Sequence, residues 1–124
     1  REQVSDQRID NQVVGELREV RGSQYAEVLE TFLADCEKRM VQLRDARSPR
    51  QLSEAAHSFK GSCSNMGATD LAELCRQLEV RVMEQPAHGI EDLISQIRCE
   101  YLEVRPFYVA ELERVSPQAA RHPV

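Results

Sequence analysis

Apolar residues recur every three or four positions over most of the chain, which is the spacing of amphipathic helices. The pattern predicts five helices, whose apolar stripes begin at Ile9, Tyr25, Leu52, Leu71 and Ile90. Neither the alternation of a half-buried strand nor an internal repeat competes with this pattern. We therefore expect an all-α protein: an antiparallel four-helix bundle with a short additional N-terminal helix.

Capping residues mark where the first three helices begin and end. Asp10 suits the start of the first helix and Gly22 its end, and Ser23 is expected to open the second helix. Ser48 followed by Pro49 suits the start of the third helix, because proline is tolerated at the first helical position. The connections are short, so consecutive helices should be antiparallel neighbours.

Glycine and proline organise the second half of the chain in the same way. Gly67 is expected to end the third helix and permit a tight reversal. The last apolar stripe contains Pro106, which predicts a kink or a split into two segments near Arg105. The predicted organisation is a loose segment, a bundle domain and a frayed tail, covering residues 1–8, 9–115 and 116–124 respectively.

The helix predicted over residues 49–65 carries a histidine on its polar face. At about 100° per residue, His57 lies about 140° from the centre of the apolar stripe and Gly61 about 180°. An interior glycine costs about 0.5–1 kcal/mol relative to alanine, so Gly61 indicates close approach of a partner. Lys60 and Ser64 lie near enough to contact an anion on the ring. This favours a nucleophilic histidine that carries an anion; the alternative is a solvated surface histidine.

The following helix offers groups that could orient the ring. Counted from the reversal at Gly67, Arg76 lies at the level of His57, and Glu79 lies about 4–5 Å further along. Helical side chains lean toward their own N-terminus, so His57 and Glu79 converge. A carboxylate there can hold one ring N–H and fix the tautomer. The alternative is that Glu79, Lys60 and Arg76 are ordinary surface charges.

Composition and charge narrow the classes of partner. The formal net charge is −5 and no basic patch is interleaved with aromatics, so we expect no nucleic-acid partner. No apolar run approaches the roughly 18 residues that cross a bilayer, so we expect no membrane insertion.

The cysteines are read as packing residues of a protein in a reducing compartment. Cys36, Cys63 and Cys75 fall on apolar stripes, whereas Cys99 does not. The histidines are scattered and no CxxC occurs, so no metal site is expected.

The motif around His57 resembles a known family. The segment His57-Ser58-Phe59-Lys60-Gly61-Ser62-Cys63, followed by Met66-Gly67-Ala68 and by Leu78-Glu79, resembles the histidine-containing phosphotransfer (HPt) domain of multistep two-component signalling. The similarity covers about residues 9–105. It departs from the commoner family pattern at Phe59 and Cys63, which lie on the core stripe and not at the ring.

The resemblance implies roles for the residues around the ring. The histidine that matches His57 is phosphorylated in the family, and the lysine that matches Lys60 lies near the phosphoryl group. The glycine that matches Gly61 leaves room for a receiver domain. The position of Glu79 often holds Gln or Glu bonded to the imidazole, whereas the position of Arg76 varies.

The resemblance also implies a phosphocarrier that has no autonomous kinase activity. It would take a phosphoryl group from the aspartyl phosphate of one receiver domain and pass it to another, with no cofactor of its own and with Mg²⁺ held by the receiver. We expect a cytoplasmic monomer, free-standing or the C-terminal domain of a hybrid sensor histidine kinase. Two alternatives stay open: a non-catalytic docking module, and a kinase-attached domain phosphorylated from ATP in trans.

Overall fold

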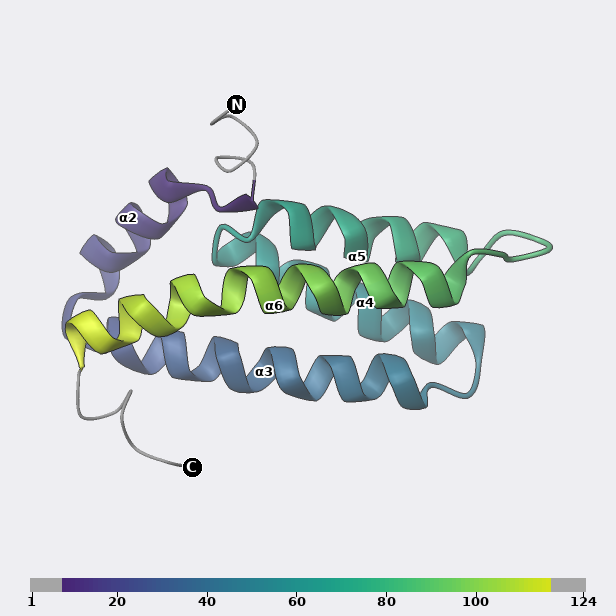
Figure 1. Ribbon diagram of the computed structural model, residues 1–124, viewed down its shortest axis with the longest axis horizontal. Coiled ribbons are helices and arrows are strands. Elements are labelled where there is room, and N and C mark those ends of the chain that lie inside the picture. Colours follow the sequence, from purple (N-terminus) through teal and green to yellow (C-terminus); the bar gives the residue numbers. More distant parts are fainter. Residues whose placement is uncertain (1–7, 117–124) are drawn as a thin grey trace.

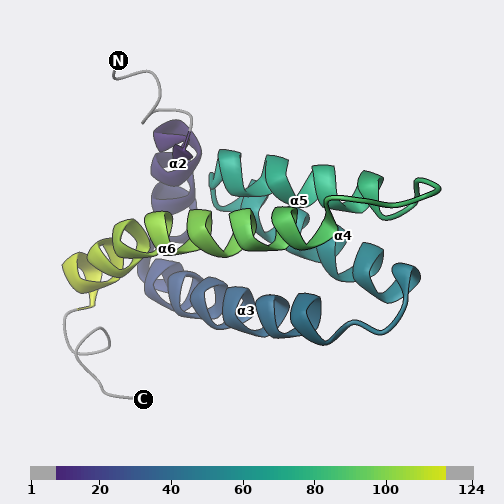
Figure 2. The same cartoon turned by 45° about the vertical axis from the view of Figure 1, so that its right-hand side comes forward.

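The computed structural model describes residues 8–116, and the helices predicted from the sequence are present in that range. The helices are α2 (Asn11–Arg21), the short 3-10 helix η1 (Gly22–Gln24), α3 (Tyr25–Asp45), α4 (Pro49–Asn65), α5 (Thr69–Arg81) and α6 (Ile90–Val115). The four long helices α3 to α6 form an antiparallel bundle, and α2 lies across one end of it (Figures 1 and 2). The predicted fold class is confirmed.

The predicted N-caps of two helices are formed. The Asp10 carboxylate accepts hydrogen bonds from the backbone N–H groups of Gln12 and Val13 at the start of α2. The Ser48 hydroxyl accepts the N–H of Gln51, and Pro49 occupies the first turn of α4. These bonds satisfy backbone donors that the first helical turn leaves without partners.

The reversal between α4 and α5 requires glycine at position 67 for two reasons. Gly67 has a φ of 79°, which side-chain-bearing residues rarely adopt. In addition, a Cβ atom there would lie 2.9 Å from the carbonyl oxygen of Asp10. The Gly67 carbonyl in turn accepts the Asp10 N–H at 2.7 Å, so the start of α2 is attached to the turn that follows α4.

The expected start of α3 is wrong, and of the kink or split expected near Arg105 the split does not occur. Ser23 does not open α3, because Gly22 (φ 53°) leads into η1 and the helix begins at Tyr25. Pro106 does not split α6, which runs without a break and bends gently in its C-terminal part (Figure 1). Pro106 is exposed while Val104 and Tyr108 on either side of it are buried, so packing holds the helix together across the proline.

The core follows the predicted stripes, including the three buried cysteines. Cys36, Cys63 and Cys75 are free thiols with no exposed surface, whereas Cys99 is exposed. Hydrogen bonds with Cys36 and Cys75, together with burial, raise the pKa of the Cys63 thiol, so it stays protonated. These cysteines therefore act as small core side chains.

The predicted domain boundaries stay predictions, because residues 1–7 and 117–124 lie outside the described residues. Arg8, at the edge of the described part, donates to Glu100 of α6 at 2.8 Å. None of the helices between residues 8 and 116 is both long and apolar enough to traverse a bilayer.

Candidate functional site

The exposed histidine of α4 faces a carboxylate of α5. The side chain of His57 is 65% exposed, and its Nδ1 lies 2.8 Å from Oε2 of Glu79. The other carboxylate oxygen, Oε1, lies 3.2 Å from Nζ of Lys60. Both oxygens of Glu79 are therefore engaged by α4, one by the ring and the other by the ammonium. The opposed leans of two antiparallel helices bring these side chains together.

The ionised state of Glu79 fixes the tautomer of the neutral ring. Partial burial alone would raise the pKa of Glu79, but the hydrogen bonds from Lys60 and His57 and the charge of the Lys60 ammonium outweigh burial, and its pKa is lowered. An ionised carboxylate can only accept hydrogen bonds, so Nδ1 of a neutral imidazole must carry the proton. The lone pair then resides on Nε2, which makes Nε2 the nucleophilic atom.

The most exposed positions of α4 beyond His57 carry small side chains or none. Apart from the neighbouring residues and backbone of its own helix, a Cβ atom added to Gly61 would have no described atom within 4 Å. Ser64 is exposed one turn further along, and Asn65 is exposed beside it. A partner can therefore reach the ring from the C-terminal half of the helix.

The structure does not bring Arg76 to the histidine. Its Nε and Nη2 atoms donate to the Glu73 carboxylate at 2.9 and 2.7 Å, one turn earlier on α5. The helical count predicts the level of Arg76 along α5, but it cannot show that the carboxylate of Glu73 binds the guanidinium. Of the four polar groups predicted around the ring, Lys60 and Glu79 contact one another directly and Ser64 lies on the same exposed face.

A groove of about 840 Å³ lies next to the exposed face of α4, between α2, α3 and α4. Its polar lining includes Ser62 and Asn65 of α4, and its apolar lining includes Leu17 of α2 and Val28 and Phe32 of α3. The sequence gives little sign of such a groove, because it forms only where three helices meet. In residues 8–116, no three His, Cys, Asp or Glu side chains are grouped so as to hold a metal ion.

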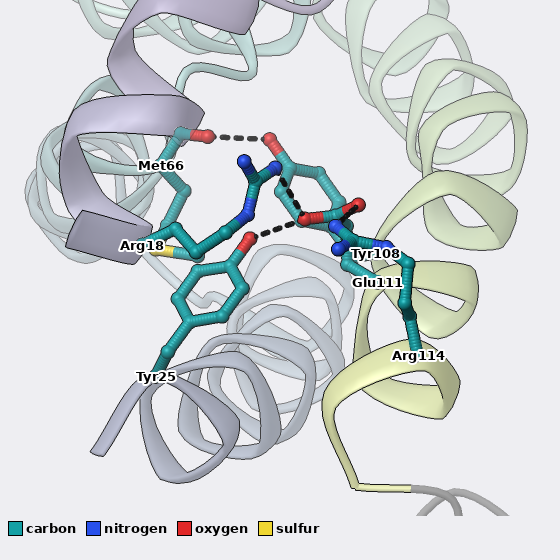
Figure 3. Close-up of polar contacts among 6 residues, drawn as sticks. All are labelled: Arg18, Tyr25, Met66, Tyr108, Glu111 and Arg114. Carbon is teal, nitrogen blue, oxygen red and sulfur yellow. Dashed lines mark hydrogen bonds and ion pairs between the residues drawn. The ribbon is translucent and has the colours of Figure 1, made fainter. Parts of the chain in front are cut away.

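Sequence reasoning also missed a buried carboxylate in α6. Glu111 is 8% exposed, and it binds Arg18, Tyr25 and Arg114 (Figure 3). Its position, one residue before Leu112 and three after Tyr108, places it on the apolar face of the helix. That placement was the available signal, since a glutamate on an apolar face requires partners.

The fold and the site together define a helical bundle that presents one oriented imidazole to a macromolecular partner. A family model described as the Hpt domain matches residues 27–116. The crystal structure of histidine-containing phosphotransfer protein B (HptB) from Pseudomonas aeruginosa PAO1 is similar, with 35% sequence identity and a TM-score of 0.82. That alignment covers 86% of this chain and 96% of HptB. No curated protein matches the chain.

The chain therefore belongs to the Hpt domain family. It is a histidine phosphotransfer protein of a phosphorelay, as the resemblance of its sequence motif predicts. Proteins of this family are carriers of the phosphoryl group and not catalysts, and they interact with receiver domains.

Proposed function

We propose that His57 is the residue that carries the phosphoryl group. Its Nε2 lone pair attacks the phosphorus of a receiver's aspartyl phosphate, forming an N–P bond while the bond from phosphorus to the aspartate oxygen breaks. The electron pair of the broken bond leaves with the aspartate carboxylate. The reverse reaction delivers the group to the next receiver. The contact between Nδ1 and Glu79 carries this proposal, because it leaves Nε2 as the exposed nucleophile.

Glu79 keeps the ring in its reactive form throughout transfer. The Nδ1 proton stays on the ring, since no step of the reaction removes it. Phosphorylation at Nε2 places positive charge on the imidazole, and the carboxylate at 2.8 Å stabilises that charge. Glu79 is thus an orienting group and a counter-charge, and the proton remains at Nδ1.

Lys60 supplies positive charge beside the transferred group. Its ammonium already lies 3.2 Å from Glu79, one turn from the ring on the same side of α4. When the phosphoryl group arrives, the ammonium can share its three donors between the carboxylate and the phosphoryl oxygens. We therefore assign Lys60 to stabilisation of phosphoryl charge.

The chain needs no metal of its own in this proposal. The carboxylate that contacts the ring is Glu79, and both its oxygens are already bound by His57 and Lys60. We propose that Mg²⁺, which offsets phosphoryl charge when bound, is held by the receiver's own carboxylates. We also propose that the protein acts as a cytoplasmic monomer, and that ATP is not its direct phosphoryl donor.

The receiver is proposed to lie over the C-terminal half of α4 and the adjacent groove. A specific interface of standard size buries about 800 Å² per partner, which is more than His57 and its neighbours can supply. Gly61 leaves an open approach to the ring, and the groove beside Ser62 and Asn65 offers apolar surface from Val28 and Phe32. A domain seated there reaches His57 and covers α3 and α2 as well.

The proposal is tested with a phosphorylated receiver domain, chosen by profiling transfer against the receivers of the source organism. We expect wild-type protein to gain acid-labile phosphate and His57→Gln to gain none. His88→Gln is the matched control, because His88 lies in the exposed segment between α5 and α6. Labelling of His57→Gln at the wild-type level would overturn the assignment. Receiver binding without transfer would favour a docking module, and labelling from ATP by an attached kinase would favour the trans-phosphorylated alternative.

The open approach over Gly61 has its own test. Gly61→Gln should slow transfer from a receiver, because the added side chain occupies the space that a partner must enter. Gly15→Gln is the matched control. It adds the same side chain to a position of α2 where an added Cβ likewise meets nothing within 4 Å, and it should not slow transfer because Gly15 does not line the groove. An unchanged transfer rate in Gly61→Gln would contradict the claim that the receiver reaches His57 over Gly61.

A further inference from the structure

The buried carboxylate Glu111 joins α6 to two other helices. Its Oε1 accepts hydrogen bonds from Nη2 of Arg18 at 2.9 Å and from the hydroxyl of Tyr25 at 2.7 Å, and Arg114 binds the other oxygen (Figure 3). One oxygen atom thus links α6 to α2 and to the start of α3. Three residues earlier, the hydroxyl of Tyr108 donates to the Met66 carbonyl at 2.6 Å and holds the end of α4.

Helix α2 has few other attachments to the bundle. Val14 is its one buried side chain. Its N-terminal end is held by the hydrogen bond from Asp10 to Gly67, and its C-terminal half is held by Arg18. The Nε of Arg18 is buried and finds no hydrogen-bond acceptor within residues 8–116, so the guanidinium depends on Glu111. The bond between Arg18 and Glu111 therefore sets how α2 is rotated and how closely it approaches α6.

The rotation of α2 shapes the groove beside the phosphorylatable helix. Leu17, directly before Arg18 in the sequence, and Arg21, three residues after it, form the α2 wall of that groove. Asn65 of α4 and Val28 of α3 lie in the same groove. If α2 is released from Glu111, this wall moves, whereas His57 and Glu79 on α4 and α5 stay in place.

We propose that Glu111 is a positioning residue for receiver docking: through Arg18 it holds α2 in the position at which the groove accepts a receiver domain. Glu111 touches neither the ring nor the phosphoryl group, so its effect is on the affinity for the receiver and not on the chemical step. The inference rests on the proposed function, because it takes a receiver as the partner in the groove.

The test separates docking from chemistry in Arg18→Gln and Glu111→Gln. Transfer is measured against the concentration of a phosphorylated receiver domain. We expect the half-saturating concentration to rise about tenfold, the size of one lost hydrogen bond to a charged group, with the rate at saturation unchanged. Labelling of His57 by phosphoramidate, a donor too small to need the groove, should stay at the wild-type level. Calorimetry with the unphosphorylated receiver should show the same tenfold loss.

Arg114→Gln is the matched control, because Arg114 binds Glu111 from within α6, so the substitution removes a partner of Glu111 and leaves its bond to Arg18 of α2 in place. It should keep wild-type receiver affinity. Hydrogen exchange should speed up in α2 of Arg18→Gln and Glu111→Gln but not in the control. This measurement shows whether the bond between Arg18 and Glu111 holds α2, even if a variant is less stable.

Unchanged receiver affinity in both test variants would overturn the proposal. So would a lower saturating rate with unchanged affinity. Failure of wild-type protein to be labelled at His57 would instead refute the proposed function, and the calorimetric affinity would still decide the role of Glu111.

Discussion

Two glutamates of this protein, Glu79 and Glu111, make similar contacts in different surroundings. Each links neighbouring helices and binds at least one cationic side chain. The Glu79 side chain is 25% exposed, and that of Glu111 is 11% exposed. Burial alone would raise the pKa of Glu111, but hydrogen bonds from Arg114, Tyr25 and Arg18 outweigh burial and lower its pKa to about 2. The pKa of Glu79 is lowered as well, by the hydrogen bonds from Lys60 and His57 against a smaller degree of burial.

The difference in burial separates two roles for the same chemical group. Around Glu111, water is mostly excluded, so removing one partner leaves other buried groups without hydrogen bonds. Around Glu79, water can replace a lost contact, so Lys60 can turn from the carboxylate to an arriving phosphoryl group at little cost. The buried network is suited to fix helix positions, and the exposed one is suited to exchange partners during transfer.

The largest expected effect is on stability. Glu111→Ala should lower the free energy of unfolding by about 3 kcal/mol, because Tyr25 and Arg18 lose a buried charged acceptor. Glu79→Ala should lower it by less than about 1 kcal/mol, since its partners are more exposed. Urea unfolding followed by circular dichroism measures both. Equal losses in the two variants would contradict the distinction between the networks.

The pH dependence of the free energy of unfolding should also show the stabilising contribution of ionised Glu111. An unperturbed glutamate titrates near 4.5, and Glu111 in the folded protein titrates at about 2. Because the folded pKa is depressed, its contribution is fully present above pH 4.5 and is lost as the pH falls toward 2. The difference corresponds to about 3 kcal/mol. Urea unfolding between pH 7 and 2 should therefore show a shallower loss of stability in Glu111→Gln than in wild type; parallel curves would refute the role of this carboxylate.

A smaller effect is expected on transfer when the ring loses its orienting group. Glu79→Ala should slow transfer at saturating receiver by about tenfold, the size of one lost charged hydrogen bond. Glu79→Gln should recover most of the rate, because an amide oxygen still accepts the Nδ1 proton. ¹⁵N NMR of the imidazole should show a shift away from the Nδ1–H tautomer in Glu79→Ala alone. An unaltered tautomer and rate in that variant would remove the orienting role.

The smallest effect is expected at Lys60. An ammonium about 4 Å from a phosphoryl charge contributes about 1 kcal/mol in water, which is about fivefold in rate. Lys60→Met should slow transfer by that factor, and Lys60→Arg should not, because the charge is kept. Stopped-flow transfer at two salt concentrations measures the effect, which should shrink at high salt. A Lys60→Met variant as fast as wild type would leave Lys60 without a function in transfer.

Much of the bundle and the pairing of His57 with Glu79 could be predicted because both follow from helical periodicity. Spacing alone places His57 on the polar face and Glu79 opposite it across a short reversal. Local chemistry also suffices for the caps at Asp10 and Ser48, since each cap contacts residues that are close in sequence.

The features that could not be predicted depend on side-chain contacts, which the helical periodicity of the sequence does not specify. Arg76 was expected near the ring, but Glu73, one turn away on the same helix, holds it. Pro106 is expected to kink or split the last helix, but packing of the residues around it keeps the helix continuous. Glu111 was not singled out, because its partners Arg18 and Tyr25 lie more than 80 residues earlier and meet it only in the folded chain.

The most direct test of the account is to identify the phosphorylated atom. The protein, with its histidines labelled with ¹⁵N, is phosphorylated by a phosphorylated receiver and examined by ³¹P and ¹⁵N NMR at alkaline pH, where phosphohistidine persists. One phosphorylated residue is expected, His57, with phosphorus bonded to Nε2. Phosphate on Nδ1 of His57, or on any other residue, would contradict it.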